Sequence, residues 1–348
     1  MSDGRGTAPV TTFDGGHLEL NAEKIEKRLN EIWQEASAGY RSEMPVAKLC
    51  LSNMLVITDA AARLEGENLA NAIALKFPSR VFLMVIDELQ GAYSAFVRTS
   101  CSKDRESGMV RCFEVVELMA DISKMHFLPG ALRSLLVGSV PVIAVDFRAF
   151  QTTPELDNTI LELSDYYYVN AEVVPSGPLR RRYLPLRWYR TLVIRELFGE
   201  LLGRINAQNC RIFPKRITLY SVPEVDSFSD LLCGWLLARL GAKKPSQSGN
   251  RINAQYRQYD IVIELVEQAD RSRIALIEFD DGTIGKVERI EATETGDSAY
   301  RASCELITLD RVSISMPLSS YVIEAMQDVS EFAEYAAVVT ALDRIVVA

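Results

Sequence analysis

The sequence of 348 residues contains only two histidines, His17 and His126. A Ser-His or Cys-His mechanism would have to rest on His126, because we expect His17 to lie in a terminal tail. The sequence also lacks G-x-G-x-x-G after a strand, the G-x-x-x-x-G-K-[ST] loop and the G-x-S-x-G nucleophile turn. A lone histidine beside Phe127 and Leu128 is more often structural than catalytic. We therefore predict no catalytic and no cofactor-binding residues, and no cofactor.

Paired cysteines are also missing, since none of the six forms a C-x-x-C motif. With two histidines, a structural zinc site is improbable, and we predict no metal ligands. Cys101 and Cys112 lie in or next to two segments that are predicted to form a hairpin, and a hairpin would bring the two cysteines near each other. A free cysteine among apolar neighbours behaves as a small hydrophobic residue, so we expect six free thiols and no disulfide. The cysteines are Cys50, Cys101, Cys112, Cys210, Cys233 and Cys304.

There is no run of about 18 apolar residues that could form a membrane helix. Residues 1–17 are polar and glycine-rich, without the apolar core of a signal peptide, so we expect a cytoplasmic protein. The net charge is −9, whereas a nucleic-acid surface would need clustered lysines and arginines. Neither nucleic acid nor a membrane is an expected partner.

Length and composition predict two α/β domains, each a mixed sheet packed with helices. The predicted boundaries are a disordered tail over 1–20, an N-terminal α/β domain over 21–173, a linker over 174–185 and a C-terminal α/β domain over 186–348. Apolar runs bounded by turn residues predict buried strands, and apolar residues at a spacing of 3.6 predict helices. In the first domain we expect helices near 22–37, 59–76, 131–138 and 157–163, and strands near 46–58, 79–87, 93–101, 109–119, 140–147 and 166–170.

The clearest helix covers 226–241, where Gly241 is suited to the left-handed position that ends a helix. Trp235 lies on its apolar face and is predicted to pack in the core. Residues 243–255 are predicted to form a polar loop. Asp281-Gly282 indicates a hairpin turn, and nearby acidic residues could bind a metal or simply form an exposed turn. In the second domain we also expect helices near 187–205 and 320–345, and strands near 216–220, 259–265, 272–279, 285–292 and 304–309.

Three consecutive arginines, Arg180, Arg181 and Arg182, lie in the proline-rich segment VPSGPLRRRYLP. Guanidinium groups bind phosphates or carboxylates through two parallel hydrogen bonds, so these arginines could hold a phosphate or a partner's carboxylates. A solvated linker is the alternative interpretation. Together with Trp188 they are the candidate partner-binding residues.

Four segments, in order, resemble the OpcA family, the glucose-6-phosphate dehydrogenase assembly or effector proteins of bacteria. They begin with IEKRLNEIWQEA followed by AKLCLSNMLVIT, and continue with NAIALKFPSRVFLMVID, LPGALRSLLVGSVPVIAVDF and DSFSDLLCGWLLARLGAK. In the last segment the family pattern falls on Ser227, Leu231, Leu232, Trp235, Leu236, Arg239, Leu240 and Gly241. The chain departs from the family at Asp146, Phe147 and Arg148, where tryptophans are often found.

This resemblance implies a non-catalytic protein that binds glucose-6-phosphate dehydrogenase and favours its active oligomer in the oxidative pentose phosphate pathway. Such a protein must bind the active form of the enzyme more tightly than the inactive form. An alternative is an enzyme or sensor that binds a sugar phosphate or nucleotide, with Arg180 to Arg182 as the anion site. A structural protein with an unrelated partner is the third possibility.

Overall fold

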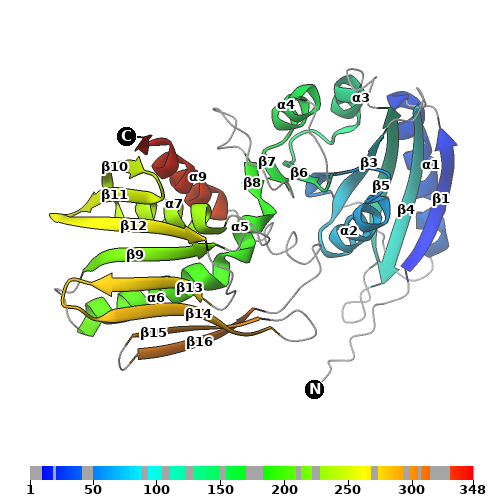
Figure 1. Cartoon of the computed structure of the whole chain (residues 1–348). Coiled ribbons are helices and arrows are strands. Elements are labelled where there is room, and N and C mark those ends of the chain that lie inside the picture. Colours follow the sequence, from blue (N-terminus) through cyan, green and yellow to red (C-terminus); the bar gives the residue numbers. More distant parts are fainter. Residues whose placement is uncertain are drawn as a thin grey trace. The chain divides into compact units, whose positions relative to one another are not determined.

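The computed structural model of the chain describes residues 10–18, 21–40, 50–87, 93–103, 110–121, 128–148, 154–169, 183–208, 213–221, 228–267, 273–292, 298–304, 307–313 and 330–347. The chain divides into two compact units, Met1–Ala171 and Glu172–Ala348. Each unit contains one mixed β-sheet packed with helices (Figure 1), which confirms the predicted fold class. None of the helices within these ranges is long and apolar enough to cross a membrane.

The sheet of the first unit has the strand order β1-β4-β5-β3-β2-β6-β7. Strands β5, β3, β2, β6 and β7 run parallel, while β4 is antiparallel to both β5 and β1. The parallel strands are covered on both faces, which explains their nearly continuous apolar runs. The strands are β1 (Val10–Leu18), β2 (Ser52–Thr58), β3 (Ser79–Asp87), β4 (Tyr93–Lys103), β5 (Val110–Asp121), β6 (Val142–Asp146) and β7 (Tyr166–Val169).

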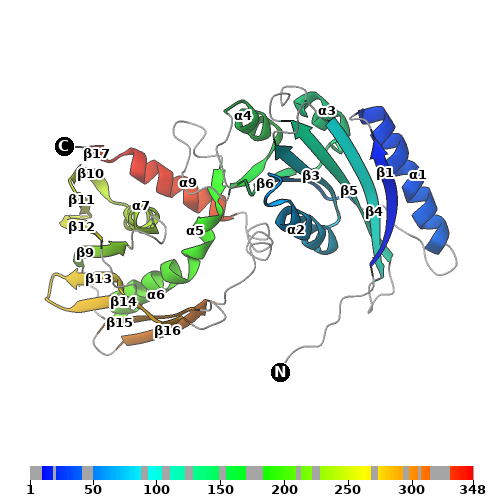
Figure 2. The same ribbon diagram turned by 45° about the vertical axis from the view of Figure 1, so that its right-hand side comes forward.

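Helices cover both faces of this sheet, with α1 and α2 on opposite sides (Figure 2). The Asn21 side chain caps α1, because it accepts a hydrogen bond from the Lys24 amide at 3.1 Å. Its apolar stripe is fully buried at Ile25, Leu29 and Ile32. The helices are α1 (Ala22–Tyr40), α2 (Arg63–Lys76), α3 (Leu128–Leu135) and α4 (Pro154–Leu163).

The predicted disordered tail over residues 1–20 is wrong for the part that the structure describes. Residues Val10–Leu18 form β1, which pairs antiparallel with β4 at the edge of the sheet. The alternating side chains of this strand are interrupted by Gly15 and Gly16, which made the segment look like a flexible tail. Gly15 lies so close to Val97 that a Cβ atom there would come within 2.5 Å of its side chain. The glycine therefore permits close packing of the strand.

The prediction of six free thiols is also wrong, because Cys101 and Cys112 form a disulfide. The register of the β4–β5 hairpin places the two residues directly opposite each other, with their Cα atoms 4.1 Å apart. Both side chains are buried against Ala36 and Trp33 of α1. Sequence spacing left the register uncertain by about two residues, and a shift of one residue would have put the two side chains on opposite faces.

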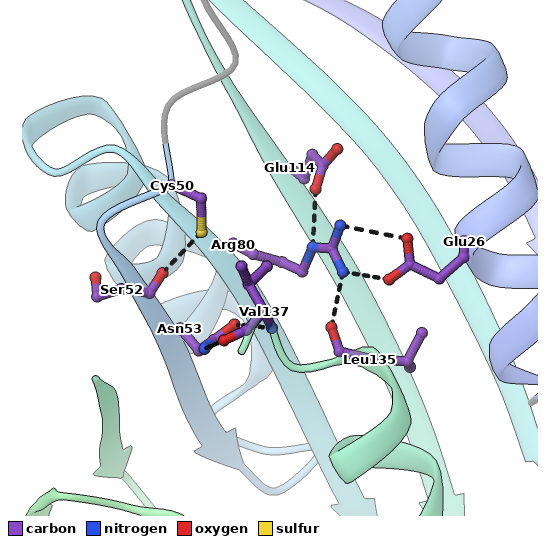
Figure 3. A network of polar contacts seen from close by, with 8 residues as sticks. All are labelled: Glu26, Cys50, Ser52, Asn53, Arg80, Glu114, Leu135 and Val137. Atoms are coloured by element: carbon purple, nitrogen blue, oxygen red, sulfur yellow. Dashed lines mark hydrogen bonds and ion pairs between the residues drawn. The ribbon is translucent and has the colours of Figure 1, made fainter. Parts of the chain in front are cut away.

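A buried arginine, Arg80, joins three elements of the first unit (Figure 3). Its Nε atom donates to Glu114 of β5 at 2.8 Å, and Nη1 donates to the Leu135 carbonyl of α3 at 2.7 Å. A further ion pair reaches Glu26 of α1. Burial alone would lower the pKa of Arg80, but the carboxylates of Glu114 and Glu26 outweigh it and raise the pKa. The charge is therefore retained inside the fold.

The sheet of the second unit has the strand order β16-β15-β14-β13-β9-β12-β11-β10-β17. It is mostly antiparallel, with parallel pairs only at β9–β12 and β10–β17. The short strand β8 (Tyr183–Pro185) precedes the first helix of this unit. The sheet strands are β9 (Pro214–Ser221), β10 (Lys243–Ser248), β11 (Arg251–Tyr256), β12 (Tyr259–Glu267), β13 (Arg273–Phe279), β14 (Ile284–Ala292), β15 (Ser298–Cys304), β16 (Ile307–Ser313) and β17 (Val346–Val347).

Three helices of the second unit lie on one face of this sheet, with α6 over β14 to β16 and α7 over β9 (Figure 2). The predicted core position of Trp235 is confirmed, since 4% of its surface is exposed. Gly241 ends α7 with a φ of 61°, and the amides of Gly241 and Ala242 bond back to Ala238 and Leu237. The helices are α5 (Leu186–Arg190), α6 (Leu192–Gln208), α7 (Phe228–Leu240) and α9 (Ser330–Asp343).

The predicted polar loop over 243–255 is wrong, because these residues form the antiparallel hairpin of β10 and β11. Alternate residues of β11 are buried, including Ile252 and Ala254, while Arg251, Asn253 and Gln255 are exposed. A strand that buries only one face needs apolar residues only at alternate positions. Its polar composition therefore concealed the alternation.

Replacing Arg80 with Met should destabilise the first unit by about 3 to 5 kcal/mol, because Glu114 would be left buried without its cation. Urea unfolding followed by circular dichroism measures the change. The double variant Arg80→Met/Glu114→Leu is the matched control and should recover much of the loss. A single variant as stable as the wild type would contradict this role for Arg80.

Non-reducing mass spectrometry should show one disulfide, which links Cys101 to Cys112, and free thiols at Cys50, Cys233 and Cys304. Closing a loop of this length stabilises a fold by about 3 kcal/mol on the chain-entropy model. Adding reductant should therefore shift the urea midpoint of the wild type downward. The double variant Cys101→Ala/Cys112→Ala should show no such shift.

Candidate functional site

Of the four residues proposed from sequence to bind a partner, the structure describes only Trp188. Arg180, Arg181 and Arg182 lie outside the described residues. Trp188 in α5 is completely buried, and the guanidinium carbon of Arg195 lies 3.8 Å from the centroid of its ring. Tyr335 of α9 packs against the same ring edge-on. Trp188 therefore joins α5, α6 and α9 inside the core, where it has no surface to offer a partner.

A cavity of about 530 Å³ lies between the C-terminal end of α7, the start of β10 and the C-terminal half of α9. All three elements belong to the second unit. Most of the residues from α7 and α9 that line it are small, and two residues of β10 and one directly after α9 are cationic. The lining residues are Leu237, Ala238, Gly241, Ala242, Lys243, Lys244, Pro245, Ala337, Thr340, Ala341 and Arg344.

The space between α7 and α9 results from the side chains on their facing surfaces. Near the middle of α7, Gly234 lets the helices approach so closely that a Cβ atom there would lie 2.7 Å from Val338 and 2.8 Å from Leu342. One turn further along α7, the helix ends, and Ala238 and Ala341 are too small to fill the gap. Close contact at the glycine and short side chains beyond it leave the cavity open at this end.

A carboxylate of α9, that of Glu334, holds the helices around the cavity in position. It accepts a hydrogen bond from Trp235 Nε1 of α7 at 2.9 Å. Its other oxygen accepts one from Arg195 of α6 at 2.8 Å. Since Arg195 is buried and charged, the ion pair both satisfies that charge and links three helices.

Three cations, Lys243, Lys244 and Arg344, line the mouth of the cavity. All three are exposed, and the contacts of the described residues include no ion pair for any of them. This concentration of positive charge contrasts with a net charge of −9 for the chain. The mouth of the cavity therefore carries local positive charge, which attracts anions.

Lys244 has a φ of 51°, in the left-handed region that residues with a side chain rarely adopt. The register between β10 and β11 also shifts between Lys243 and Ser246, which indicates a β-bulge at this point. Bulges redirect side chains and are frequent beside functional sites, and a strained backbone is a reason to look for a function. Both irregularities coincide with the two lysines of the cavity.

The end of α7 determines how an anion can be held here. The C-terminal end of a helix carries partial negative charge, so it does not attract anions. The amides of Gly241 and Ala242 are already used to cap the helix. The lysine and arginine side chains are therefore the charged donors that this cavity offers to an anion.

The first unit contains the position where α/β sheets often bind ligands, outside the carboxyl ends of β2 and β6, where the strand order reverses. Gly66 of α2 packs closely on this edge, where a Cβ atom would lie 3.1 Å from Thr58. The third glycine of the dinucleotide-binding motif G-x-G-x-x-G makes the same kind of contact. If Gly66 is that third glycine, Ala61 and Arg63 occupy the positions of the first two. The Arg63 side chain is held by Glu67 and Glu117. These residues do not fit a dinucleotide, because backbone approach to a pyrophosphate requires glycine here.

Other candidate chemical groups are engaged or inactive. The acidic residues predicted near the β13–β14 turn have structural partners, since Asp280 accepts from the Phe213 amide and Asp281 from the Thr283 amide. Burial, and secondarily the Asp230 carboxylate, raises the pKa of the Cys233 thiol to about 12, so it is not a nucleophile at neutral pH. Among the described residues, no group of three potential metal ligands occurs.

Sequence reasoning missed the lysines of the cavity because they were assigned to a polar loop. The available signal was a Lys-Lys pair directly after the capping residue Gly241. Arg344 could not be connected with them, since it lies about 100 residues further along the chain and only the fold brings it near.

No protein-family model matches this sequence, and no curated protein matches it. Similar solved structures include KijD10, a 3-ketoreductase from Actinomadura kijaniata, in complex with NADP and TDP-benzene. This structure has a TM-score of 0.38 and 9% identity, over 86% of this chain and 99% of KijD10. The open conformation of KijD10 has the same TM-score, 7% identity and coverage of 86% and 100%.

KijD10 is an enzyme, and this comparison contradicts the prediction that the chain is a non-catalytic effector that activates a dehydrogenase. That prediction, with its assignment to the pentose phosphate pathway, is withdrawn. The resemblance to the OpcA family is tested by none of these comparisons and stays a prediction. At this TM-score the likeness assigns neither the cofactor nor the reaction of KijD10 to this chain.

Replacing Gly234 with Ala should destabilise the second unit by about 1 to 3 kcal/mol, because the new methyl group overpacks the contact with Val338 and Leu342. Thermal unfolding measures the effect. Gly199→Ala in α6 is the matched control, since its Cβ position has open space. That control should keep or raise the melting temperature, because alanine favours a helix over glycine by up to about 1 kcal/mol. Equal effects of the two substitutions would contradict close α7–α9 contact.

Proposed function

We propose that this protein binds a phosphorylated sugar or a nucleotide in the cavity between α7, β10 and α9, and that it acts as an enzyme or sensor for that ligand. The observation that carries the proposal is the convergence of Lys243, Lys244 and Arg344 on one cavity. These cations come from two segments that are distant in sequence. Their positions support a specific anion site rather than a general basic surface.

A phosphate group matches this arrangement of charge. A phosphate monoester carries nearly two negative charges at neutral pH, and three cations can balance it. Arg344 can donate two parallel hydrogen bonds to phosphate oxygens, while the lysines act as mobile point charges. The described residues that line the cavity include no aspartate or glutamate, so none of them repels an anion.

The rest of the cavity supports a small organic group attached to the phosphate. Its volume of about 530 Å³ lies within the usual range for small-molecule sites, roughly 300 to 1,000 Å³. Ala238, Ala337 and Ala341 form a smooth apolar wall on which one face of a sugar or base can rest. The hydroxyl of Thr340 donates to the Ala336 carbonyl, which leaves its oxygen able to accept a hydrogen bond from a ligand hydroxyl.

The partner implied by the OpcA resemblance, glucose-6-phosphate dehydrogenase, is a separate question that neither the structure nor the comparisons test. Binding to that enzyme stays a prediction from sequence. Co-purification of the two proteins at physiological salt is the direct measurement.

Glucose 6-phosphate or AMP should raise the melting temperature of the wild-type protein by several degrees, whereas glucose and adenosine should not. A ligand at 100 times its dissociation constant stabilises the folded state by about 2.7 kcal/mol. Calorimetric titration of the better ligand then gives its dissociation constant. Arg344→Gln should weaken binding at least roughly tenfold, because it removes a charge-assisted contact.

The variant Lys244→Gly separates binding from stability. Glycine adopts a φ of 51° without strain, so this variant should melt at or above the wild-type temperature without ligand, and it should bind more weakly. Lys215→Gln, at an exposed lysine of β9 outside the cavity, is the matched control and should bind as the wild type does. The proposal would be contradicted if Arg344→Gln and Lys244→Gly bound the ligand as tightly as Lys215→Gln does. It would also be contradicted if no phosphorylated probe changed the melting temperature.

A further inference from the structure

The sheet of the second unit has one face without a helix among the described residues (Figure 1). Helices α6, α7 and α9 cover the other face, and alternate strand residues such as Ile217, Ile263 and Ile277 are fully buried beneath them. The residues between these point to the opposite side, which we call the outer face. Because neighbours in a strand alternate between faces, the outer face is defined by sequence and register alone.

An apolar strip lies across the middle of the outer face. Tyr220 on β9 pairs directly with Val266 on β12, and Leu276 on β13 pairs with Thr218 on β9. Ile274 lies two residues from Leu276 on the same side of β13. The apolar side chains of this strip, those of Tyr220, Val266, Ile274 and Leu276, are only partly buried, whereas Thr218 between them is buried. The strip therefore retains apolar surface that a docked protein could remove from water.

Charged residues surround the strip and are nearly balanced in sign. Three ion pairs connect neighbouring strands, Arg216–Glu278 at 3.5 Å, Arg251–Glu264 at 3.0 Å and Arg301–Asp310 at 2.8 Å. The described charges of this face are five acidic and four basic, whereas the whole chain has a net charge of −9. The acidic residues are Asp260, Glu264, Glu278, Glu288 and Asp310, and the basic residues are Arg216, Arg251, Lys286 and Arg301.

The outer face is large enough for a stable interface. From β11 to β16 it spans seven neighbouring strands. With strands about 4.8 Å apart and roughly seven residues of about 3.3 Å each, the face covers on the order of 700 Å². Two such faces would bury about 1,400 Å² in total, which is within the usual range for specific complexes.

We propose that the outer face binds a second copy of this chain and forms a twofold symmetric dimer. In such a dimer the same patch meets itself, so its charges must complement themselves. A face with alternating cations and carboxylates and almost no net charge meets this requirement, although the chain as a whole repels its copies. An apolar strip within a charged border has the composition of a protein–protein interface. This inference is independent of the proposed ligand.

Light scattering coupled to size-exclusion chromatography tests the proposal on the full chain. At tens of micromolar, the wild type should have twice the chain mass of 38.9 kDa. Leu276→Lys should shift it to the monomer, because a charge would then lie in the centre of the interface. Leu64→Lys, at an apolar residue of α2 that is 70% exposed, is the matched control and should stay dimeric.

A second variant tests the outer face in case Leu276→Lys does not fold. Lys286→Glu replaces an exposed outer-face cation, so it should fold normally and weaken dimerisation at least tenfold by adding repulsion in both copies. Thermal unfolding confirms that each variant is folded. A monomeric wild type contradicts the proposal, as does a dimer that Leu276→Lys and Lys286→Glu leave intact, since that dimer would use another surface.

Discussion

The contact between α7 and α9 is the constraint on which the second unit depends. Gly234 lets the two helices approach closely, and Glu334 joins α9 to Trp235 of α7 and to the buried Arg195 of α6. Neither feature involves the cations of the cavity, yet both determine where those cations lie. If the helices separated, Arg344 at the end of α9 would no longer face Lys243 and Lys244 at the start of β10. Packing in the core thus places the charges at the surface.

Each of the two units is held together by a buried, ion-paired arginine. Each contains a nearly inaccessible arginine, Arg80 in the first and Arg195 in the second, that links elements distant in sequence. A buried cation is costly unless carboxylates surround it, so each arginine tolerates only one arrangement of its neighbours. In the first unit this fixes α1 and α3 on the sheet. In the second it fixes three helices around a cavity.

Features with strong local signals could be predicted from the sequence. The apolar run at Ser79–Asp87, the cap at Asn21 and the helix end at Gly241 each depend on residues within a few positions of one another. Features that depend on register or on distant segments could not be predicted. The Cys101–Cys112 bond required the exact pairing of β4 with β5, and the cavity required α9 to return to β10. The edge strand β1 and the strand β10, which lies next to the edge, were missed because their polar and glycine-containing sequences resemble loops.

The central claim is that Lys243, Lys244 and Arg344 hold a phosphate group. A crystal structure of the protein grown with glucose 6-phosphate or AMP tests it most directly. The account predicts phosphate oxygens within about 3 Å of Arg344 and of at least one lysine, with the sugar or base against Ala337 and Ala341. A ligand bound elsewhere on the protein, or density for no ligand at saturating concentration, would contradict it.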